Sequence, residues 1–259
     1  MKTKELTSLA MAALLLAACS VEQEFASTPS GEGILRATVE GASPATRAGF
    51  DSEGAFYWTT GDQLGVTTTS SSNSFSALTL QSEAGQASGT FDGKISGELG
   101  SYAVYPYSAS HSLSSTTLTY NFPATYNYTK VDADFFSATQ GEGNSFNPAM
   151  WGSISNGSTR LKHLGGVFCI KIEKMPLATG KLIVTATDKD ITGDFTANLG
   201  DVDPVLTSSG LTTSRNEVTI TFSNASTETS GVFYIPVPTG TYNVRIKMTD
   251  NSDTTPAKI

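Results

Sequence analysis

Residues 55–69 read AFYWTTGDQLGVTTT, and the order of residue types in this stretch decides the fold class. Aromatic and β-branched residues favour extended backbone, whereas the Gly61-Asp62 pair between them favours a turn. The stretch therefore predicts a strand, a tight turn and a second strand. In the first strand Phe56 and Trp58 share one face, which favours burial of both over a sugar-stacking platform on the surface.

Short strands separated by turns continue along the rest of the chain. Apolar residues alternate with polar ones in ten further segments, at 35–39, 74–80, 89–95, 101–109, 115–126, 161–175, 181–187, 218–223, 231–237 and 242–248. Such alternation predicts half-buried strands. Residues 132–157 lose the alternation and predict a long connection, packed down by its aromatic residues and by Met150. Helical periodicity is minor outside the N-terminal apolar run, so we predict an all-β protein.

The length of the chain fits two β domains of roughly 100 residues each. We predict two β-sandwich domains, one at residues 48–157 and one at residues 158–259, with the boundary near Gly157. Regularly spaced strands are typical of sandwiches and barrels. The chain shows no repeat of fixed period, which argues against a propeller or a solenoid.

The N-terminus predicts export as a lipoprotein. Lys2 and Lys4 precede a short apolar run, which is the pattern of a signal peptide over residues 1–18. The run is too short to cross a bilayer. The tetrapeptide LAAC at 16–19 resembles the lipobox of bacterial lipoproteins, which implies cleavage before Cys19 and acylation of its thiol and new amine. The mature chain would then be tethered to the outer membrane by the lipid on Cys19.

Residues 19–47 follow as a tether and pro-segment that contains one strand. In that strand Leu35, Ala37 and Val39 alternate with polar residues and predict one buried face. Just after Cys19, Glu22 and Glu24 resemble the surface-export signal of Bacteroidetes lipoproteins. The second cysteine, Cys169, then has no disulfide partner, and we interpret it as a small buried apolar residue.

Composition and motifs argue against several functions. The net charge is −8 and basic clusters are lacking, so we expect no nucleic-acid partner. The two histidines, His111 and His163, lie in no catalytic motif, so we expect no catalytic residues, no cofactor and no enzyme activity. Asp188, Asp190 and Asp194 resemble the start of a calcium loop, but the later glycine and glutamate are missing. We interpret them as solvated turn carboxylates and expect no metal site.

Four stretches, in order, resemble the landmarks of the fimbrillin family of the Bacteroidetes. They are TRA at 46–48, FYWTTGDQLGV at 56–66, SYAVYPYS at 101–108 and LKHLGGVFCIKI at 161–172. The most specific piece is the pattern W-x-x-G-D-x-[ILV]-x-V, formed here by Trp58, Gly61, Asp62, Leu64 and Val66. Members of this family are major-fimbria and minor-fimbria-like lipoproteins that build type V pili.

The resemblance implies a structural subunit of a surface fimbria with a role in adhesion, built from two sandwich domains of transthyretin-like, Greek-key topology. It also implies cleavage between Arg47 and Ala48 by an Arg-specific surface protease. The strand with Leu35, Ala37 and Val39 would then leave an open sheet edge. A strand of another fimbrial subunit would fill that edge by donor-strand exchange.

Other interpretations stay open. If Arg47 is an ordinary loop residue, the chain is a monomeric surface-anchored lipoprotein that binds glycan or protein, or a pilus anchor that keeps its lipid. Members of the fimbrillin family run past the strand that ends here at Met248, into C-terminal strands that act as the donor. Because this chain stops at Ile259, we expect either a fragment or an incomplete C-terminal domain.

Overall fold

The computed structural model describes residues 31–40, 58–129, 148–175, 179–208, 215–223, 229–250 and 252. These residues form sixteen strands and no helix, which confirms the predicted all-β class. Within them there is accordingly no helix of the length and apolarity that crossing a membrane requires.

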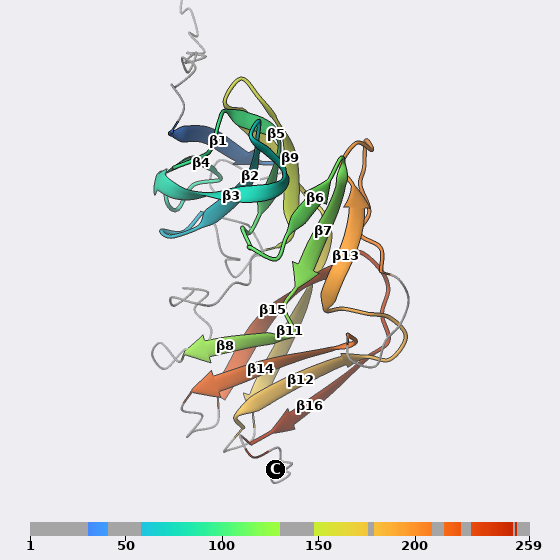
Figure 1. Cartoon of the computed structure of the whole chain (residues 1–259). Coiled ribbons are helices and arrows are strands. Elements are labelled where there is room, and N and C mark those ends of the chain that lie inside the picture. The colour runs from blue at the N-terminus through green and yellow to red at the C-terminus, as the bar shows by residue number, and fades with distance from the viewer. Residues whose placement is uncertain are drawn as a thin grey trace, which may run out of the picture.

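Seven strands in the upper half of Figure 1 form a closed sheet. They are β1 (Gly33–Val39), β2 (Gln63–Thr68), β3 (Ser71–Ser82), β4 (Ser88–Gly93), β5 (Leu99–Tyr105), β9 (Met150–Ser155) and β10 (Ser158–His163). Their order is β3-β2-β5-β9-β10-β1-β4, and pairing of β3 with β4 joins the two ends. Closure leaves none of the seven strands as a free edge.

Alternate side chains of these strands fill the interior of the closed sheet. Leu64, Leu78 and Phe91 are fully buried in this cluster. Trp58 packs edge-on against two rings, with centroid distances of 4.8 Å to Phe91 and 5.0 Å to Tyr105. The aromatic residue that opens the family motif is therefore a core residue of the closed sheet.

A short sheet packs against the outside of the closed sheet. Its strands are β6 (Ser112–Ser114), β7 (Thr117–Phe122) and β13 (Gly193–Asn198), attached to β3 through the pair Ser74–Ser112. Leu118, Phe122 and Phe195 of this sheet share a buried cluster with Val104 and Trp151 of the closed sheet. This cluster joins the upper and middle parts of the molecule.

Two sheets in the lower half of Figure 1 pack face to face. One contains β8 (Thr125–Thr129), β12 (Lys181–Ala186), β14 (Glu217–Ser223) and β16 (Val244–Thr249), in the order β16-β12-β14-β8. The other pairs β11 (Gly165–Met175) with β15 (Thr229–Pro238). Leu182, Ile220 and Phe233 are fully buried between them.

Strand pairing crosses the predicted boundary near Gly157. This glycine lies between β9 and β10, which pair with each other in the closed sheet. β8 precedes the boundary but pairs with β14, and β13 follows it but pairs with β7. The strands of residues 48–157 and 158–259 are thus interleaved, and the prediction of two β-sandwich domains with these bounds is not confirmed.

The predicted connection at 132–157 contains a strand that the pattern did not reveal. Met150 and Trp151 are buried as expected, but they belong to β9. Gly152 interrupts the alternation there. A Cβ at Gly152 would lie 2.6 Å from the carbonyl oxygen of Arg160 on β10, so the close approach of the two strands requires glycine.

Cys169 is exposed, which contradicts the interpretation of a buried residue. Phe168 and Ile170 pack against the core cluster of the face-to-face sheets. Successive residues of a strand point to opposite faces, so Cys169 between them points outward.

We therefore expect Cys169 to react with a thiol reagent in the native protein at nearly the rate measured in denaturant, because exposure controls thiol access. The time course of modification by 5,5′-dithiobis(2-nitrobenzoate) measures this, and Cys169→Ser separates its signal from that of Cys19. A thiol that reacts only after unfolding would contradict the assigned orientation of β11.

His111 is a buried titratable group that makes stability depend on pH. Its ring is stacked on Tyr120 with centroids 4.1 Å apart, and its Nδ1 atom has no hydrogen-bond partner among the described residues. Burial lowers the pKa of His111 to about 4, although the backbone of Asn121 and the charge of Asp194 oppose this shift. The folded protein therefore holds this imidazole neutral.

In the unfolded chain His111 binds a proton near pH 6.5, whereas in the folded protein it does so only near pH 4. The free energy of unfolding is therefore unaffected by this group above pH 6.5 and decreases as the pH falls from 6.5 toward 4. We expect this group to make the protein about 2 kcal/mol less stable at pH 5 than at pH 7. Urea denaturation of wild type and His111→Phe at both pH values measures the difference. Equal pH dependence in the two proteins would contradict a neutral buried His111.

Candidate functional site: the β1 slot

β1 fills the space between β4 and β10, which we call the β1 slot. It pairs with β4 in antiparallel fashion from Gly33 to Thr38 and with β10 in parallel fashion from Arg36 to Val39. If β1 were absent, both neighbours would present unpaired backbone N–H and C=O groups. The most N-terminal described strand is therefore also the one that closes the sheet between them.

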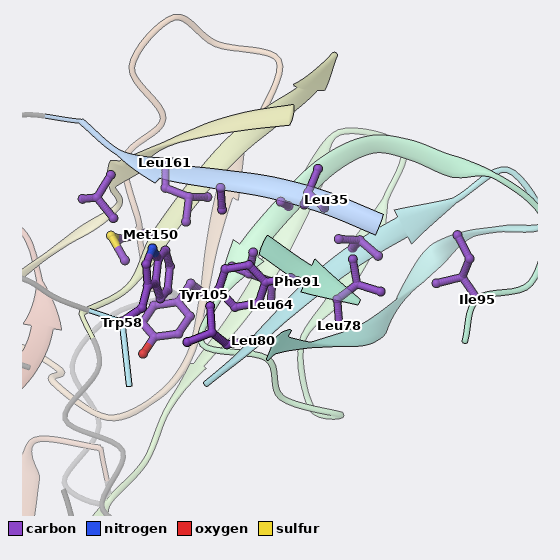
Figure 2. Close-up of a cluster of buried hydrophobic side chains, with 14 residues drawn as sticks. Leu35, Trp58, Leu64, Leu78, Leu80, Phe91, Ile95, Tyr105, Met150 and Leu161 are labelled. Carbon is purple, nitrogen blue, oxygen red and sulfur yellow. The ribbon is translucent and has the colours of Figure 1, made fainter. Parts of the chain in front are cut away.

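The inward face of β1 consists of the three residues that the sequence alternation singles out. Leu35 and Ala37 are 0% exposed and Val39 is 3% exposed. Figure 2 shows Leu35 pointing from β1 into the interior cluster, with Phe91, Leu64 and Leu78 below it. Burial of each of the two larger side chains is worth roughly 1.5–3 kcal/mol, so they anchor the strand.

Trp58 and Gly89 form part of the floor of the slot. Gly89 of β4 is paired with Ala37. A Cβ at Gly89 would lie 2.5 Å from Leu80 Cδ1 and 3.1 Å from Trp58 Cδ1. Because Gly89 has no side chain, the indole of Trp58 can lie directly beneath the ladder between β4 and β1. Sequence analysis did not single out Gly89, and its only signal is a glycine within a predicted strand.

Asp62 fixes the turn that delivers Trp58 to this floor. Its backbone N–H donates to the carbonyl oxygen of Thr59 at 3.0 Å, and its Oδ2 accepts from the Thr59 N–H at 2.7 Å. The hydroxyl of Tyr105 donates to Asp62 Oδ1 at 3.0 Å. Burial raises the pKa of Asp62, and the bonds from Thr59 and Tyr105 act in the opposite direction. Gly61 supplies the φ of +92° that this turn needs.

The residues of the W-x-x-G-D-x-[ILV]-x-V pattern are therefore structural parts of the closed sheet. Trp58, Leu64 and Val66 are 0% exposed and belong to its interior. Gly61 and Asp62 shape the turn before β2. Trp58, Leu64 and Val66 share this interior with the inward face of β1.

The outward face of β1 is held by weaker contacts. Arg36 lies 3.5 Å from Glu83, and Glu40 lies 3.9 Å from Arg160. These side chains are 33–69% exposed, and ion pairs of this kind contribute about 1 kcal/mol or less. The apolar face and the backbone ladders, rather than charge, retain the strand.

The remaining predicted site residues lie elsewhere. Cys19, Arg47 and Ala48 are outside the described residues. Within the part of the chain that the structure describes, no three His, Cys, Asp or Glu side chains come together as metal ligands would. Asp188 and Asp194 are exposed, as predicted, and accept hydrogen bonds from Asn243 and Asn121. Asp190 is buried, 3.7 Å from Arg215, so its interpretation as a solvated turn carboxylate was wrong.

Comparison with known proteins adds little to this description. No protein-family model matches the chain, and no curated protein matches it. A solved structure from Bacteroides ovatus ATCC 8483, for which a role in cell adhesion has been suggested, resembles it with a TM-score of 0.42 and 11% identity. The alignment covers 88% of this chain and 85% of that one. At this TM-score the likeness supports no conclusion about function.

We expect Leu35→Ala to destabilise the protein by about 2–5 kcal/mol, because it leaves a cavity in the interior beneath β1. The matched control is Thr38→Ala on the exposed face of the same strand, for which we expect a change of about 0.5 kcal/mol or less. Urea denaturation monitored by tryptophan fluorescence measures both. Similar small effects would contradict the burial of Leu35 in the closed sheet.

Proposed function

We propose that the protein is a structural subunit of a surface fimbria, whose β1 slot accepts a strand of another subunit after cleavage at Arg47. One observation carries the proposal: β1 is buried and paired on both sides, yet its only covalent link to the other strands of the closed sheet runs through the connection that contains residues 41–57. Arg47 is the only arginine or lysine in that connection. A single cut there leaves β1 without a covalent link to the closed sheet.

The cut changes what holds the sheet closed. β1 is then retained only by its two ladders and by the inward face of Leu35, Ala37 and Val39. Its departure exposes the edges of β4 and β10 and the apolar floor around Trp58. A strand from another subunit with the same apolar alternation can pair with both open edges and cover the apolar floor. This is the physical basis of donor-strand exchange.

The rest of the proposed pathway concerns the N-terminus and the partners. Export as a lipoprotein places the chain on the outer membrane through Cys19, an Arg-specific surface protease cuts it, and other fimbrial subunits receive it. In the assembled fimbrium the protein contributes to adhesion. We propose no catalytic role. The transthyretin-like topology implied by the family resemblance belongs to this proposal.

A pilus anchor that keeps its lipid is the second candidate. It is favoured by the complete integration of β1 in the uncut chain, where Leu35 and Ala37 are 0% exposed. In that case the slot is never vacated and residues 19–47 remain in place. A monomeric surface-anchored lipoprotein that binds glycan or protein would retain them in the same way.

An Arg-specific protease applied to the purified chain tests the proposal. We expect a product that begins at Ala48 and that forms polymers as the β1 peptide is lost, because the open edges then require a new strand. N-terminal sequencing identifies the cut before Ala48, intact mass measures loss of the β1 peptide, and electron microscopy detects polymers.

Arg47→Gln is the control and should stay uncut and unassembled. A synthetic peptide of residues 31–40 in excess should refill the slot and block polymers. Cleavage at Arg47 with β1 still bound and no assembly would contradict the proposal and favour the anchor.

A further inference from the structure

Four large apolar side chains are exposed in the described part of the chain, and they form two pairs. Val202 is 82% exposed and Val205 is 59% exposed, in the segment between β13 and β14. Val244 and Ile246 are 47% and 44% exposed, on β16. The charged residues next to the first pair in the sequence are acidic, namely Asp201 and Asp203, and those next to the second pair are basic, namely Arg245 and Lys247.

The first surface, which we call the basic edge, consists of Val244, Arg245, Ile246 and Lys247. β16 is the outermost strand of its sheet and pairs only with β12 within the described residues. Among the described residues the facing sheet has two strands. Val184 and Ala186 of β12 are 0% exposed, whereas their partners on β16, Ile246 and Val244, stay exposed. Arg245 and Lys247 are exposed on the other face, and neither forms an ion pair with a described residue.

The charges of the basic edge disfavour pairing of β16 with a second β16 strand. In an antiparallel pair of two β16 strands, Arg245 and Lys247 of one copy would lie opposite the same residues of the other copy. Like charges directly opposite each other destabilise a sheet. A partner that combines apolar with acidic side chains is complementary to this edge.

The second surface, which we call the acidic loop, consists of Asp201, Val202, Asp203 and Val205. Asn198 holds the loop in place, since its side-chain amide donates to Asp201 Oδ1 at 2.8 Å and its carbonyl oxygen accepts from the Asp201 N–H at 3.1 Å. Asp203 lies 4.0 Å from Lys162 Nζ, but the aspartate side chain is 86% exposed. Its carboxylate therefore remains accessible to a partner.

We propose that the acidic loop of one copy docks on the basic edge of a second copy. Two carboxylates separated by one residue match two cations separated by one residue, and each surface adds two exposed apolar side chains. Charge complementarity steers such surfaces together, and apolar contact adds to the attraction. The second copy is the occupant because this chain itself carries both complementary surfaces.

The positions of the two surfaces make the contact intermolecular. In Figure 1 the chain leaves β13 at the end of the molecule that is far from β16. A contact between two different surfaces at opposite ends joins copies head to tail, and such a contact repeats as an open chain unless it closes into a ring. It requires no cleavage at Arg47, so it goes beyond the proposed strand exchange and is tested apart from it.

Charge reversal with mixing tests the contact in the uncut full-length chain. One variant carries Arg245→Glu and Lys247→Glu, and the other carries Asp201→Lys and Asp203→Lys. Alone, each variant has like charges on both surfaces, so we expect self-association at least about tenfold weaker than in wild type. An equimolar mixture restores opposite charges at every junction and should associate again.

Sedimentation equilibrium at low and high salt measures the association, and circular dichroism checks that both variants fold. Wild-type association should weaken with salt, because exposed ion pairs are screened. Val244→Ser with Ile246→Ser should weaken it without changing the salt dependence. The proposal is overturned if wild type stays monomeric at millimolar concentration or if the mixture fails to associate. Binding of wild type to phosphatidylglycerol vesicles that the Arg245 and Lys247 reversal abolishes, without self-association, would assign the edge to a membrane instead.

Discussion

The structure depends on the closure of a seven-stranded sheet by a strand from the N-terminal part of the described chain. β1 supplies backbone partners to both β4 and β10, and its apolar face completes the interior around Trp58. Without it the closed sheet becomes an open one with two unpaired edges and an exposed core. The short sheet of β6, β7 and β13 packs on this unit through the cluster around Val104 and Phe122. The closed sheet and its core therefore depend on one short segment.

The sequence pattern predicted the parts of the fold that depend on local alternation. The strands at 35–39, 74–80 and 181–187 coincide with β1, β3 and β12 to within a few residues. The burial of Trp58 was also predicted correctly, although Trp58 itself lies before β2 and outside any described strand. What alternation does not contain is the order in which strands pair. β8 with β14 and β7 with β13 are separated by long stretches of sequence, and no local signal predicts such contacts.

The same limit applies to the candidate site. Leu35, Ala37 and Val39 are recognisable from sequence because one face of the strand is uniformly apolar. Gly89 is not recognisable, because its importance comes from Leu80 and Trp58, which approach it only after folding. The orientation of Cys169 was predicted wrongly, since a cysteine between apolar neighbours looks buried unless the period of two is applied strictly.

The two neighbours of β1 also have a consequence for any strand that replaces it. β4 runs opposite to β1 and β10 runs with it, so the walls of the slot point in opposite directions. An entering strand forms one parallel and one antiparallel ladder whichever way it points. Backbone hydrogen bonding therefore has little power to choose its polarity. The volumes of the inward side chains select the orientation instead, because the slot accommodates leucine, alanine and valine in that order along β1. The orientation of an entering strand is therefore selected by three apolar side chains rather than by the backbone of the sheet.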